Sequence, residues 1–490
     1  MDKGIMGKIR YFSIVFGELG EILVFISPLT LLPLLVALLF GEWELLLPLG
    51  TVPVIFFTCG VVLNSIPRHE GKVRFSAALC SVALVWLTFA LVSCIPFMVV
   101  LDIPFTDALF ETMAGWTGTG FTLLQNIGAL PKSLLFWRTY MQWLGGLAII
   151  SLSLTVAFQS SLEKIPLFRP ENRTERIIPS IIANGKEIWA VYILLTVISV
   201  GLIMIAKVPL WDSLNLALSG ISTGGFIPVE GGISAYHNRA LEYLLLPVMV
   251  MGSVPFSLFY MTYRNRKVSF FSDDQVRLLI YFLCFGFLIV IGDLVFVANH
   301  TLAEAVRQGL FITTAVISST GFQNIDPYLY PSVTLVFLTM FMFIGGSSGS
   351  TSGGVHLSRI ALGYRGIIWW FRRAFVRGTV LVPFRYQGKN IPIDIADAEL
   401  SKSMLVIILS VISVFIATMV ILQVDIISCD VTVLVFDIVS ALSSCGVSAG
   451  YVSPAMPLVS KWVFIFVMWL GRLDVIPVIA LFIGILKGSD

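Results

Sequence analysis

The sequence predicts an all-α integral membrane protein with ten transmembrane helices, and three observations support this fold class. Of its 490 residues, 57% are hydrophobic and only 12% are charged, whereas soluble domains carry about 25% charged residues. Ten apolar stretches are long enough to cross a bilayer as helices, which takes about 20 residues each. A fourfold internal repeat, described below, arranges eight of these stretches in pairs.

The ten expected spans also predict how the chain lies in the membrane. They are drawn at about 22–40, 46–65, 75–100, 134–158, 188–206, 240–262, 278–298, 332–361, 403–428 and 458–486. No cleavable signal peptide is expected, because the first apolar run has no small-residue cleavage site beside it. Most Lys and Arg residues then lie on one side, in the N-terminus, in the connections 66–74, 159–187, 263–277 and 359–402, and at Lys487. The positive-inside rule makes this side cytoplasmic, so both termini of this multi-pass cell-membrane protein are expected inside.

The outer connections after the third, fifth, seventh and ninth spans follow one pattern. Each starts with a semi-apolar piece of about 12 residues, too short to cross a bilayer but long enough for a half-helix. Each then reaches a cluster of small residues: Gly118-Thr119-Gly120, Ser222-Thr223-Gly224, Ser319-Thr320-Gly321 and Ser444-Cys445-Gly446. We align the repeats on the last glycine of each cluster, which places a large residue ten positions earlier: Phe110, Leu214, Phe311 and Phe436.

This repeat divides the chain into five units. The expected boundaries are 1–70 for an N-terminal two-span unit and 71–165, 166–270, 271–375 and 376–490 for four pore repeats. Each repeat is a span, a half-helix, a glycine-containing strand and a second span. Four such repeats predict one pseudo-fourfold pore.

The repeated clusters predict an ion filter. A half-helix that enters from outside directs its C-terminus, and the negative end of its dipole, toward the membrane centre. Glycine then allows the backbone carbonyls to face a common axis, and rings of carbonyl oxygens replace the water shell of potassium in selectivity filters. The alternative is that each Ser-Gly or Thr-Gly pair is ordinary packing or turn chemistry. Four copies in one phase favour the filter, with potassium bound only by the twelve cluster residues.

The stretch "GSSGSTSGG" interrupts the second span of the third repeat. It comprises Gly346, Ser347, Ser348, Gly349, Ser350, Thr351, Ser352, Gly353 and Gly354. Non-helical backbone at bilayer depth survives only inside protein or along a water-filled cavity, so the stretch is a pore element, a broken-helix binding site or a close-packed seam. We expect no such interruption in the equivalent spans of the other repeats, although the first has Gly145-Gly146.

Several charged and titratable residues stand out around this pore. Arg472 lies inside the last span, where a charge costs about 2.5–3.5 kcal/mol on insertion scales, so it should face water or a partner. Asp474 is a weak candidate for that partner, since residues two apart face different sides of a helix. Acids around the half-helices make a vestibule, caps or filter contacts: Asp107, Glu111, Asp212, Glu304 and Asp437. The histidines (His69, His237, His300 and His356) share no metal spacing, and only His356 lies where its titration could matter.

At these motifs the sequence resembles the Trk/Ktr/HKT superfamily of potassium transporters, and it is most similar to the TrkH/TrkG branch because of its two extra N-terminal spans. The matching motifs are "ETMAGWTGTGFT", "SGISTGGF", "SSTGF", "GGSSGSTSGG" and "WLGRLDVIPV". The resemblance implies potassium uptake, a homodimer, and a cytoplasmic nucleotide-binding regulatory subunit of the TrkA type. It also implies that 346–354 is an intramembrane gate and that Arg472 stands in the ion path below the filter.

Three departures from the family pattern concern the filter and the gate. Gly118 brings no hydroxyl to its ring, Cys445 stands where other repeats carry Thr, and His356 replaces the usual Lys after the gate. The sequence leaves open whether ions flow as in a channel or by symport with protons or sodium. The basic segment 359–402 is either an interfacial loop or the docking surface for the regulatory partner.

Other function classes fit the sequence less well. A less selective monovalent cation pore remains an alternative. A secondary transporter of a small solute would need broken helices paired between inverted halves, whereas the repeats here run in one direction. An enzyme is not expected, because the chain carries no paired acids, metal cluster or nucleophile–base arrangement. No nucleotide fingerprint is present, and we expect neither an organic cofactor nor a nucleic-acid partner.

Overall fold

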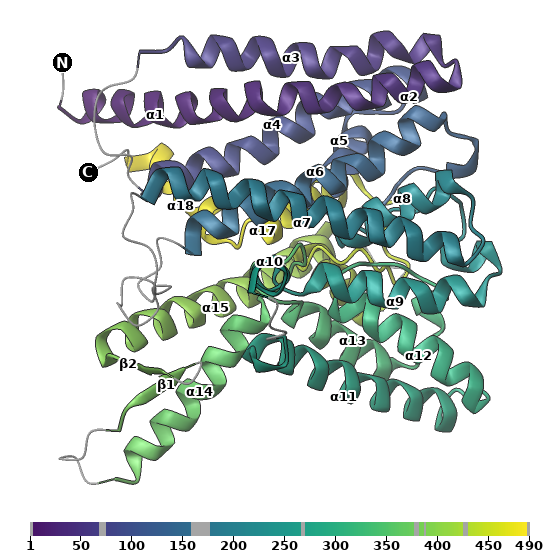
Figure 1. Ribbon diagram of the computed structural model, residues 1–490, viewed down its shortest axis with the longest axis vertical. Helices are drawn as coiled ribbons and strands as arrows, with labels where there is room; N and C mark the ends of the chain where they lie inside the picture. The colour runs from purple at the N-terminus through teal and green to yellow at the C-terminus, as the bar shows by residue number, and fades with distance from the viewer. Residues whose placement is uncertain are drawn as a thin grey trace.

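The computed structural model describes residues 3–67, 75–157, 177–265, 270–376, 382–386, 389–424 and 430–487. Within them the chain is almost entirely helical (Figure 1). One small exception corrects the all-α prediction, since β1 (Phe384–Tyr386) and β2 (Lys389–Ile391) pair as an antiparallel hairpin. The hairpin falls inside the basic segment 359–402, which the sequence treated as a loop.

The N-terminal unit consists of two long apolar segments that pack side by side. The first runs through α1 (Lys3–Ile26), a short 3-10 turn and α2 (Leu32–Phe40), and the second is α3 (Leu46–Asn64). Figure 1 shows α1 and α3 together at one edge of the molecule, next to α4 (Phe75–Leu101). This arrangement agrees with the expected pair of N-terminal spans.

Four short helices occupy the interior and correspond to the predicted half-helices. They are α5 (Phe105–Thr117), α8 (Leu210–Ile221), α12 (Leu302–Ile317) and α16 (Val431–Leu442). Pro104, Pro209, Thr301 and Asp430 precede them. Proline, threonine and aspartate before the first turn are common helix-start residues. Each of the four helices is buried along most of its length.

Longer helices surround these four. The first spans of the repeats are α4, α7 (Ile177–Ile205), α11 (Asp274–Phe296) and α15 (Ile393–Val424). The second spans begin with α6 (Lys132–Ala157), α9 (Arg239–Ser253), α13 (Ser332–Ile344) and α17 (Leu458–Arg472). Helix α6 packs against α8, α9 against α12, α13 against α16, and α17 against α5. Each second span therefore contacts the half-helix of the next repeat, and the last closes the circle with the first.

The second spans are broken more often than the sequence predicted. Helix α9 bends by 93° into α10 (Phe256–Asn265), and α17 bends by 105° into α18 (Ile476–Lys487). In the third repeat, α13 ends at Ile344 and α14 (Leu357–Ala374) begins after a loop. The expectation that only this repeat would be interrupted is therefore wrong. Pro255 explains one break, since proline cannot continue a helix, and Asp474 and Val475 have positive φ angles at the other.

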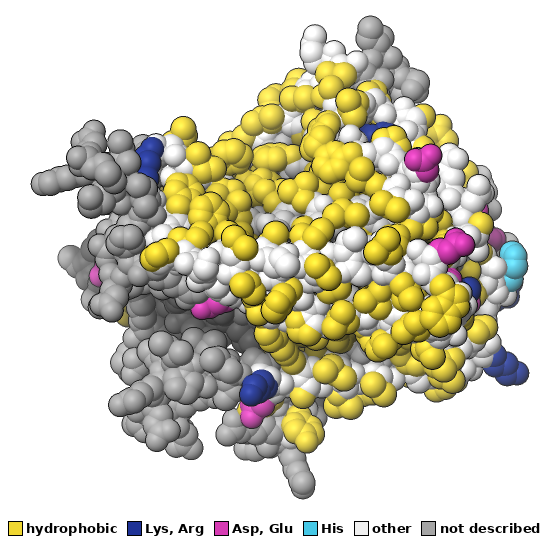
Figure 2. All heavy atoms as spheres, turned by 90° about the horizontal axis from the view of Figure 1, so that it is seen from above, with side chains coloured by type: hydrophobic (Ala, Val, Ile, Leu, Met, Phe, Trp, Pro, Cys, Tyr) yellow, Lys and Arg dark blue, Asp and Glu magenta, His cyan; other side chains and the backbone are white. Residues whose placement is uncertain are grey.

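By length and composition, the described residues contain six helices able to cross a membrane, or eight if each bent pair counts as one span. The two expected spans that correspond to α6 and α13 do not pass this test: α13 has only 13 residues, and α6 is long enough but is not among the helices that meet the composition criteria. Figure 2 shows one face of the molecule, where hydrophobic side chains cover most of the surface and charged side chains lie toward its margins. Large exposed residues such as Leu39, Val197 and Phe285 contribute to the apolar surface of the molecule, as expected for contact with lipid.

Candidate functional site

The four half-helices end in the same way, and their ends define the site. The amide of the second residue after α5, and of the third residue after each of the other three helices, donates to a carbonyl five residues earlier, at 2.8–3.0 Å. The donors are Thr119, Gly224, Thr320 and Cys445, and the acceptors are Ala114, Ser219, Ala315 and Ser440. The residue before each donor has a left-handed backbone: Gly118, Thr223, Ser319 and Ser444. This is the hydrogen-bond pattern of a Schellman cap.

These caps correct the alignment of the second repeat by one residue. The glycines with positive φ that follow the donors are Gly120, Gly225, Gly321 and Gly446, with φ between +78° and +84°. Gly225, and not Gly224, is therefore the equivalent of the other three. Ser222 falls one position before the ring segment, and buried Asn215 rather than Leu214 is the equivalent of Phe110. The phenylalanine after the glycine, present in three repeats as Phe121, Phe226 and Phe322, was the signal for the correct alignment.

Four backbone carbonyls form a closed ring at this level. A Cβ atom added to Gly225 would lie 2.6 Å from the carbonyl oxygen of Thr320. A Cβ at Gly321 would overlap the carbonyl oxygen of Cys445, one at Gly446 that of Thr119, and one at Gly120 that of Gly224. Each carbonyl therefore faces the glycine of the preceding repeat, in cyclic order. Only residues without a Cβ fit this close approach.

The residues of the ring line an open cavity. This cavity has a volume of about 440 Å³, and all four ring glycines line it, together with Arg138, Phe226, Gln323 and Asp326. None of the five acids singled out in the sequence lines it. The predicted filter residues are thus brought together at one place, except Ser222, which belongs to the end of α8.

Two of those acids instead hold the segments that follow the ring. Asp437 of α16 accepts hydrogen bonds from the amides of Ala449 (2.6 Å), Tyr451 (3.1 Å) and Val452 (3.0 Å), and from the Ser448 hydroxyl (2.8 Å). Its side chain is fully buried. Since a buried carboxylate is stable only with such partners, Asp437 fixes the strand of the fourth repeat.

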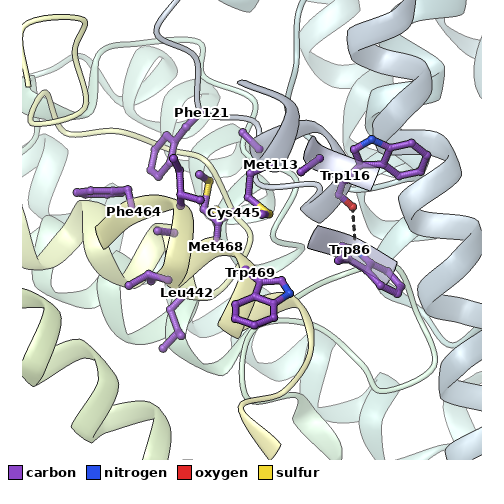
Figure 3. Packing of buried hydrophobic residues seen from close by; sticks show 14 of the residues in the cluster. Trp86, Met113, Trp116, Phe121, Leu442, Cys445, Phe464, Met468 and Trp469 are labelled. Carbon is purple, nitrogen blue, oxygen red and sulfur yellow. Dashed lines mark hydrogen bonds between the residues drawn. The ribbon is translucent and has the colours of Figure 1, made fainter. Parts of the chain in front are cut away.

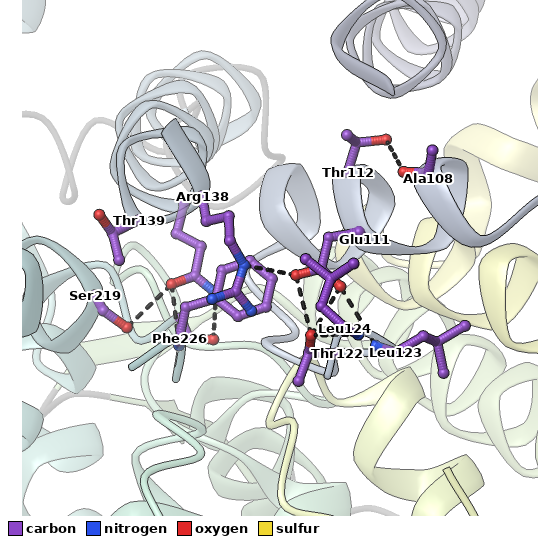
Figure 4. A network of polar contacts seen from close by, with 12 residues as sticks. Ala108, Glu111, Thr112, Thr122, Leu123, Leu124, Arg138, Thr139, Ser219 and Phe226 are labelled. Carbon is purple, nitrogen blue, oxygen red and sulfur yellow. Dashed lines mark hydrogen bonds and ion pairs between the residues drawn. The ribbon is translucent and has the colours of Figure 1, made fainter. Parts of the chain in front are cut away.

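Glu111 of α5 has the same role in the first repeat. It accepts from the hydroxyl of Thr122 at 2.9 Å and forms a buried ion pair with Arg138, whose Nε lies 2.7 Å from its Oε1 (Figure 4). The Arg138 guanidinium also stacks 4.2 Å from the centre of the Phe226 ring, in the second repeat. The sequence analysis missed Arg138, although a charged residue inside a predicted span is a signal for a functional contact.

Two more of the acids named in the sequence analysis, Asp107 and Glu304, lie beside basic side chains. Lys461 Nζ lies 2.7 Å from Asp107 Oδ1, which links α17 to α5. Glu304 lies near His300, with 3.9 Å between the nearest atoms. Glu242, which the sequence analysis also missed, pairs with Arg307 at 2.7 Å and accepts from Asn324 at 3.0 Å. In the described parts of the chain, no three or more His, Cys, Asp or Glu residues come together in a group that could hold a metal ion.

Buried tryptophans in and around the first half-helix, α5, pack in the apolar core and also form hydrogen bonds to neighbouring helices (Figure 3). Trp86 Nε1 donates to the carbonyl of Trp116 at 3.1 Å, and Trp116 Nε1 donates to the Ser93 hydroxyl at 2.9 Å. Trp469 donates to the Ala83 carbonyl at 3.0 Å, which ties α17 to α4. These buried indole contacts connect α5 and α17 to α4.

The loop between α13 and α14 lies within reach of the half-helix ends. The hydroxyl of Thr351 donates to the carbonyls of Ile221 and Gly252, both at 2.9 Å. The amide of Ser347 donates to the Ser253 carbonyl at 3.1 Å, and a Cβ at Gly353 would overlap the Ser443 carbonyl. The loop thus contacts the ends of α8, α9 and α16, and most of it is buried.

Arg472 meets this loop from α17. Its Nη1 donates to the Thr351 carbonyl at 2.8 Å, and the buried Nε and Nη2 have no hydrogen-bond partner among the described residues. A Cβ added to Gly118 would lie 3.6 Å from Nη1, so the guanidinium also lies next to the start of the first ring segment. Asp474 does not pair with Arg472. It accepts two hydrogen bonds from Arg359 of α14, at 2.9 and 2.7 Å, and it lies 4.0 Å from His356.

His69, which the sequence analysis named, lies outside the described residues. Five cysteines within the described parts have free thiols, and Cys445 is one of them. Most of the basic connection 159–187 also lies outside the described residues, whereas α14 is described and has Arg372 and Arg373 in its last turn.

Comparison with known proteins supports one family. A family model described as TrkH, cation transport protein, matches residues 53–489. An uncharacterized cation transporter of Methanocaldococcus jannaschii is 31% identical over 95% of this chain and 94% of its own length. The Trk system potassium uptake protein TrkH of Halomonas elongata is 26% identical over 95% and 97% of the two chains. The crystal structure of the potassium transporter TrkH from Vibrio parahaemolyticus superposes with a TM-score of 0.83 over 96% and 98%, at 23% identity.

Proposed function

Because this chain belongs to the TrkH family of cation transport proteins, we propose that it carries potassium across a cell membrane through the carbonyl ring. The family consists of transporters and not of enzymes, and the chain is a multi-pass membrane protein. Relatives of nearly equal length are named as potassium uptake proteins. This supports potassium as the transported and bound ion.

The observation that carries the proposal is the cyclic contact between carbonyls and glycines. Four half-helices present their C-terminal ends at one point, where the helix dipole favours a cation. The carbonyls of Thr119, Gly224, Thr320 and Cys445 replace the water shell of the ion there, and the glycines that follow them line the cavity through which it arrives. The corrected set of filter residues is Gly118, Thr119, Gly120, Thr223, Gly224, Gly225, Ser319, Thr320, Gly321, Ser444, Cys445 and Gly446.

The loop 346–354 and Arg472 form the gate of this pathway. The bond from Arg472 to the Thr351 carbonyl holds the loop near the ends of the half-helices, and the positive charge raises the barrier to potassium. Opening moves the loop aside, and Arg359, bonded to Asp474, ties α14 to the break in α17–α18. A movement of α14 is therefore transmitted to both parts of the gate: to the loop 346–354, which precedes α14 in the chain, and to the α17–α18 break beside Arg472.

The assembly follows the family as well. We propose ten spans, counted with the broken helices, in the five units drawn from the sequence, with both termini in the cytoplasm. The protein acts as a homodimer with a TrkA-like nucleotide-binding subunit on the side of α14 and the hairpin. In Figure 1, α14, α15 and the hairpin lie on the side of the molecule where α1 begins.

Tracer flux tests this function. The purified protein in liposomes, loaded with potassium, should take up rubidium in exchange, and external potassium should compete far better than external sodium. Equal competition by both ions would favour the less selective cation pore. Uptake that depends on a small organic solute and not on potassium would favour the secondary transporter.

A further inference from the structure

The side chain of Gln142, in α6, bridges three parts of the second repeat. Its Nε2 donates to the carbonyl of Gly224 at 2.5 Å, and its Oε1 accepts from the Ser219 hydroxyl at 3.0 Å and from the Phe226 amide at 3.3 Å. Ser219 and Phe226 are labelled in Figure 4. Gln142 is fully buried, so one side chain of the first repeat connects the half-helix, the ring and the strand of the second.

The partners fix which way the amide of Gln142 faces. A backbone N–H only donates, so the atom facing Phe226 is the acceptor oxygen. The nitrogen must then face Gly224, whose carbonyl only accepts. The donor of Gln142 is therefore directed at one of the four ring oxygens.

Gly224 differs from its three equivalents in the ring, because it has no side chain to anchor it. The Thr119 hydroxyl lies 2.8 Å from that of Thr117, and the Thr320 hydroxyl lies 2.7 Å from that of Ser318. A Cβ at Gly224 would overlap Cδ and Oε1 of Gln142. Gln142 thus fills the room that a side chain at position 224 would take.

The repeats offer an internal comparison for Gln142. The second spans align as "MQWLGG", "VMVMGS", "FMFIGG" and "VMWLGR". Gly145, Gly252 and Gly471 support this alignment, because a Cβ at each would meet the carbonyl of the residue four before the ring glycine: Trp116, Ile221 and Leu442. The positions equivalent to Gln142 are all buried methionines: Met249, Met342 and Met468. Methionine has no donor, and in the described chain the ring carbonyls of Thr119, Thr320 and Cys445 accept no side-chain hydrogen bond.

We propose that Gln142 is a specificity-determining residue of the filter, acting as the external anchor of the Gly224 carbonyl. This inference rests on the proposed potassium function. In three repeats the residue that supplies the ring carbonyl has a side chain of its own, and the aligned position of the second span is a methionine. In the second repeat the ring residue is Gly224, which has no side chain, and the aligned position is Gln142. The amide holds the oxygen at the distance that suits potassium. Without it the carbonyl is free to move inward and coordinate the smaller sodium ion.

The test is rubidium uptake by the full-length protein in liposomes, with potassium or sodium as competitor. Gln142→Met puts the residue of the other repeats at this position and conserves volume, so the fold should persist. The preference for potassium over sodium should fall about three- to tenfold, the range that loss of one hydrogen bond, that to the Gly224 carbonyl, gives. Gly224→Thr alone should lower uptake, because the new side chain overlaps Gln142. The double variant recreates the pattern of the other repeats and should return the preference to within about twofold of the parent, a strongly non-additive result.

The outcomes separate this inference from the proposed function. A parent protein without potassium preference contradicts both. A selective parent whose preference is unchanged in Gln142→Met overturns the anchor alone, as does a double variant that is worse than either single variant. If Gln142→Met is not recovered as a monodisperse protein, Gln142→Glu replaces it, since glutamate has the same shape but its carboxylate cannot donate to Gly224. Retained preference in that variant would also overturn the anchor.

Discussion

At the scale of single residues, the ring begins with a strained backbone. Four residues with left-handed φ start the segments, and only Gly118 among them is glycine; Thr223, Ser319 and Ser444 have φ of 51°, 55° and 50°. A residue with a Cβ costs about 1–2 kcal/mol in this conformation. Such strain persists where the surrounding structure fixes it, as at functional sites. Here the Schellman bonds to the half-helices supply that constraint.

The ring glycines give the first prediction. Gly225→Ala should reduce the preference for potassium and lower thermal stability, because the new Cβ has φ of +84° and lies 2.6 Å from the Thr320 carbonyl. The strain alone is about 1–2 kcal/mol. Gly128→Ala is the control, since a Cβ there meets open space at ordinary φ. Competition of sodium with rubidium uptake, measured for both variants, checks the prediction, and equal behaviour of the two variants would contradict it.

This glycine also shows what the sequence could and could not predict about the site. In three of the four clusters the glycine used for the alignment is the one that lies in the carbonyl–glycine ring. The second has Gly224 and Gly225 in succession, and matching on "STG" chose the wrong one. Only the cap geometry distinguishes them. The sequence analysis missed Gln142 and Glu242 because their partners lie in the next repeat. It missed Arg138, whose partners are Glu111 of the same repeat and Phe226 of the next, because the sequence does not show which acid faces it.

Arg472 gives the second prediction. Two like charges about 4 Å apart repel by about 4 kcal/mol at an effective dielectric of 20, so a guanidinium in the ion path strongly slows conduction. Arg472→Ala should raise basal rubidium flux at least about tenfold. Arg472→Lys keeps the charge and should stay near the parent. Flux in Arg472→Ala at or below the parent rate, with normal assembly, would remove this residue from the barrier.

At the scale of elements, the breaks in the second spans are where the structure differs most from the sequence prediction. A hydropathy pattern indicates how much apolar chain is present but not whether it stays one helix. Helices α9 and α10, and α17 and α18, read as continuous spans in the sequence because apolar residues continue through each bend. The loop between α13 and α14 was predictable, since its Gly and Ser residues interrupt the apolar pattern itself.

Loop length gives the third prediction. Deletion of Ser347–Ser352 removes Thr351, whose carbonyl accepts from Arg472 and whose hydroxyl donates to Ile221 and Gly252. Basal flux should therefore rise. Combination with Arg472→Ala should be less than additive, because both changes remove one shared barrier. If neither the deletion nor the combination conducts faster than the parent while both insert normally, the loop is a packing seam and not a gate.

At the scale of the whole molecule, the basic end of α14 gives the fourth prediction. Arg372 and Arg373 are exposed in the last turn of the helix that follows the loop 346–354. Reversal of both to Glu should weaken co-purification of a TrkA-like subunit, and the loss should be smaller in high salt because exposed charges are screened. Reversal of Arg239, in the first turn of α9 and away from α14, is the control. Undiminished binding by the double reversal would exclude this surface as the electrostatic dock.

The central claim is that one chain forms a fourfold ion site from four unequal segments. A crystal structure of the protein grown in rubidium, with data collected at the rubidium absorption edge, tests it most directly. The account predicts an anomalous peak on the axis of the ring, within coordinating distance of the carbonyls of Thr119, Gly224, Thr320 and Cys445, which weakens when potassium replaces rubidium. An empty ring, or a peak bound elsewhere while the ring stays intact, would contradict it.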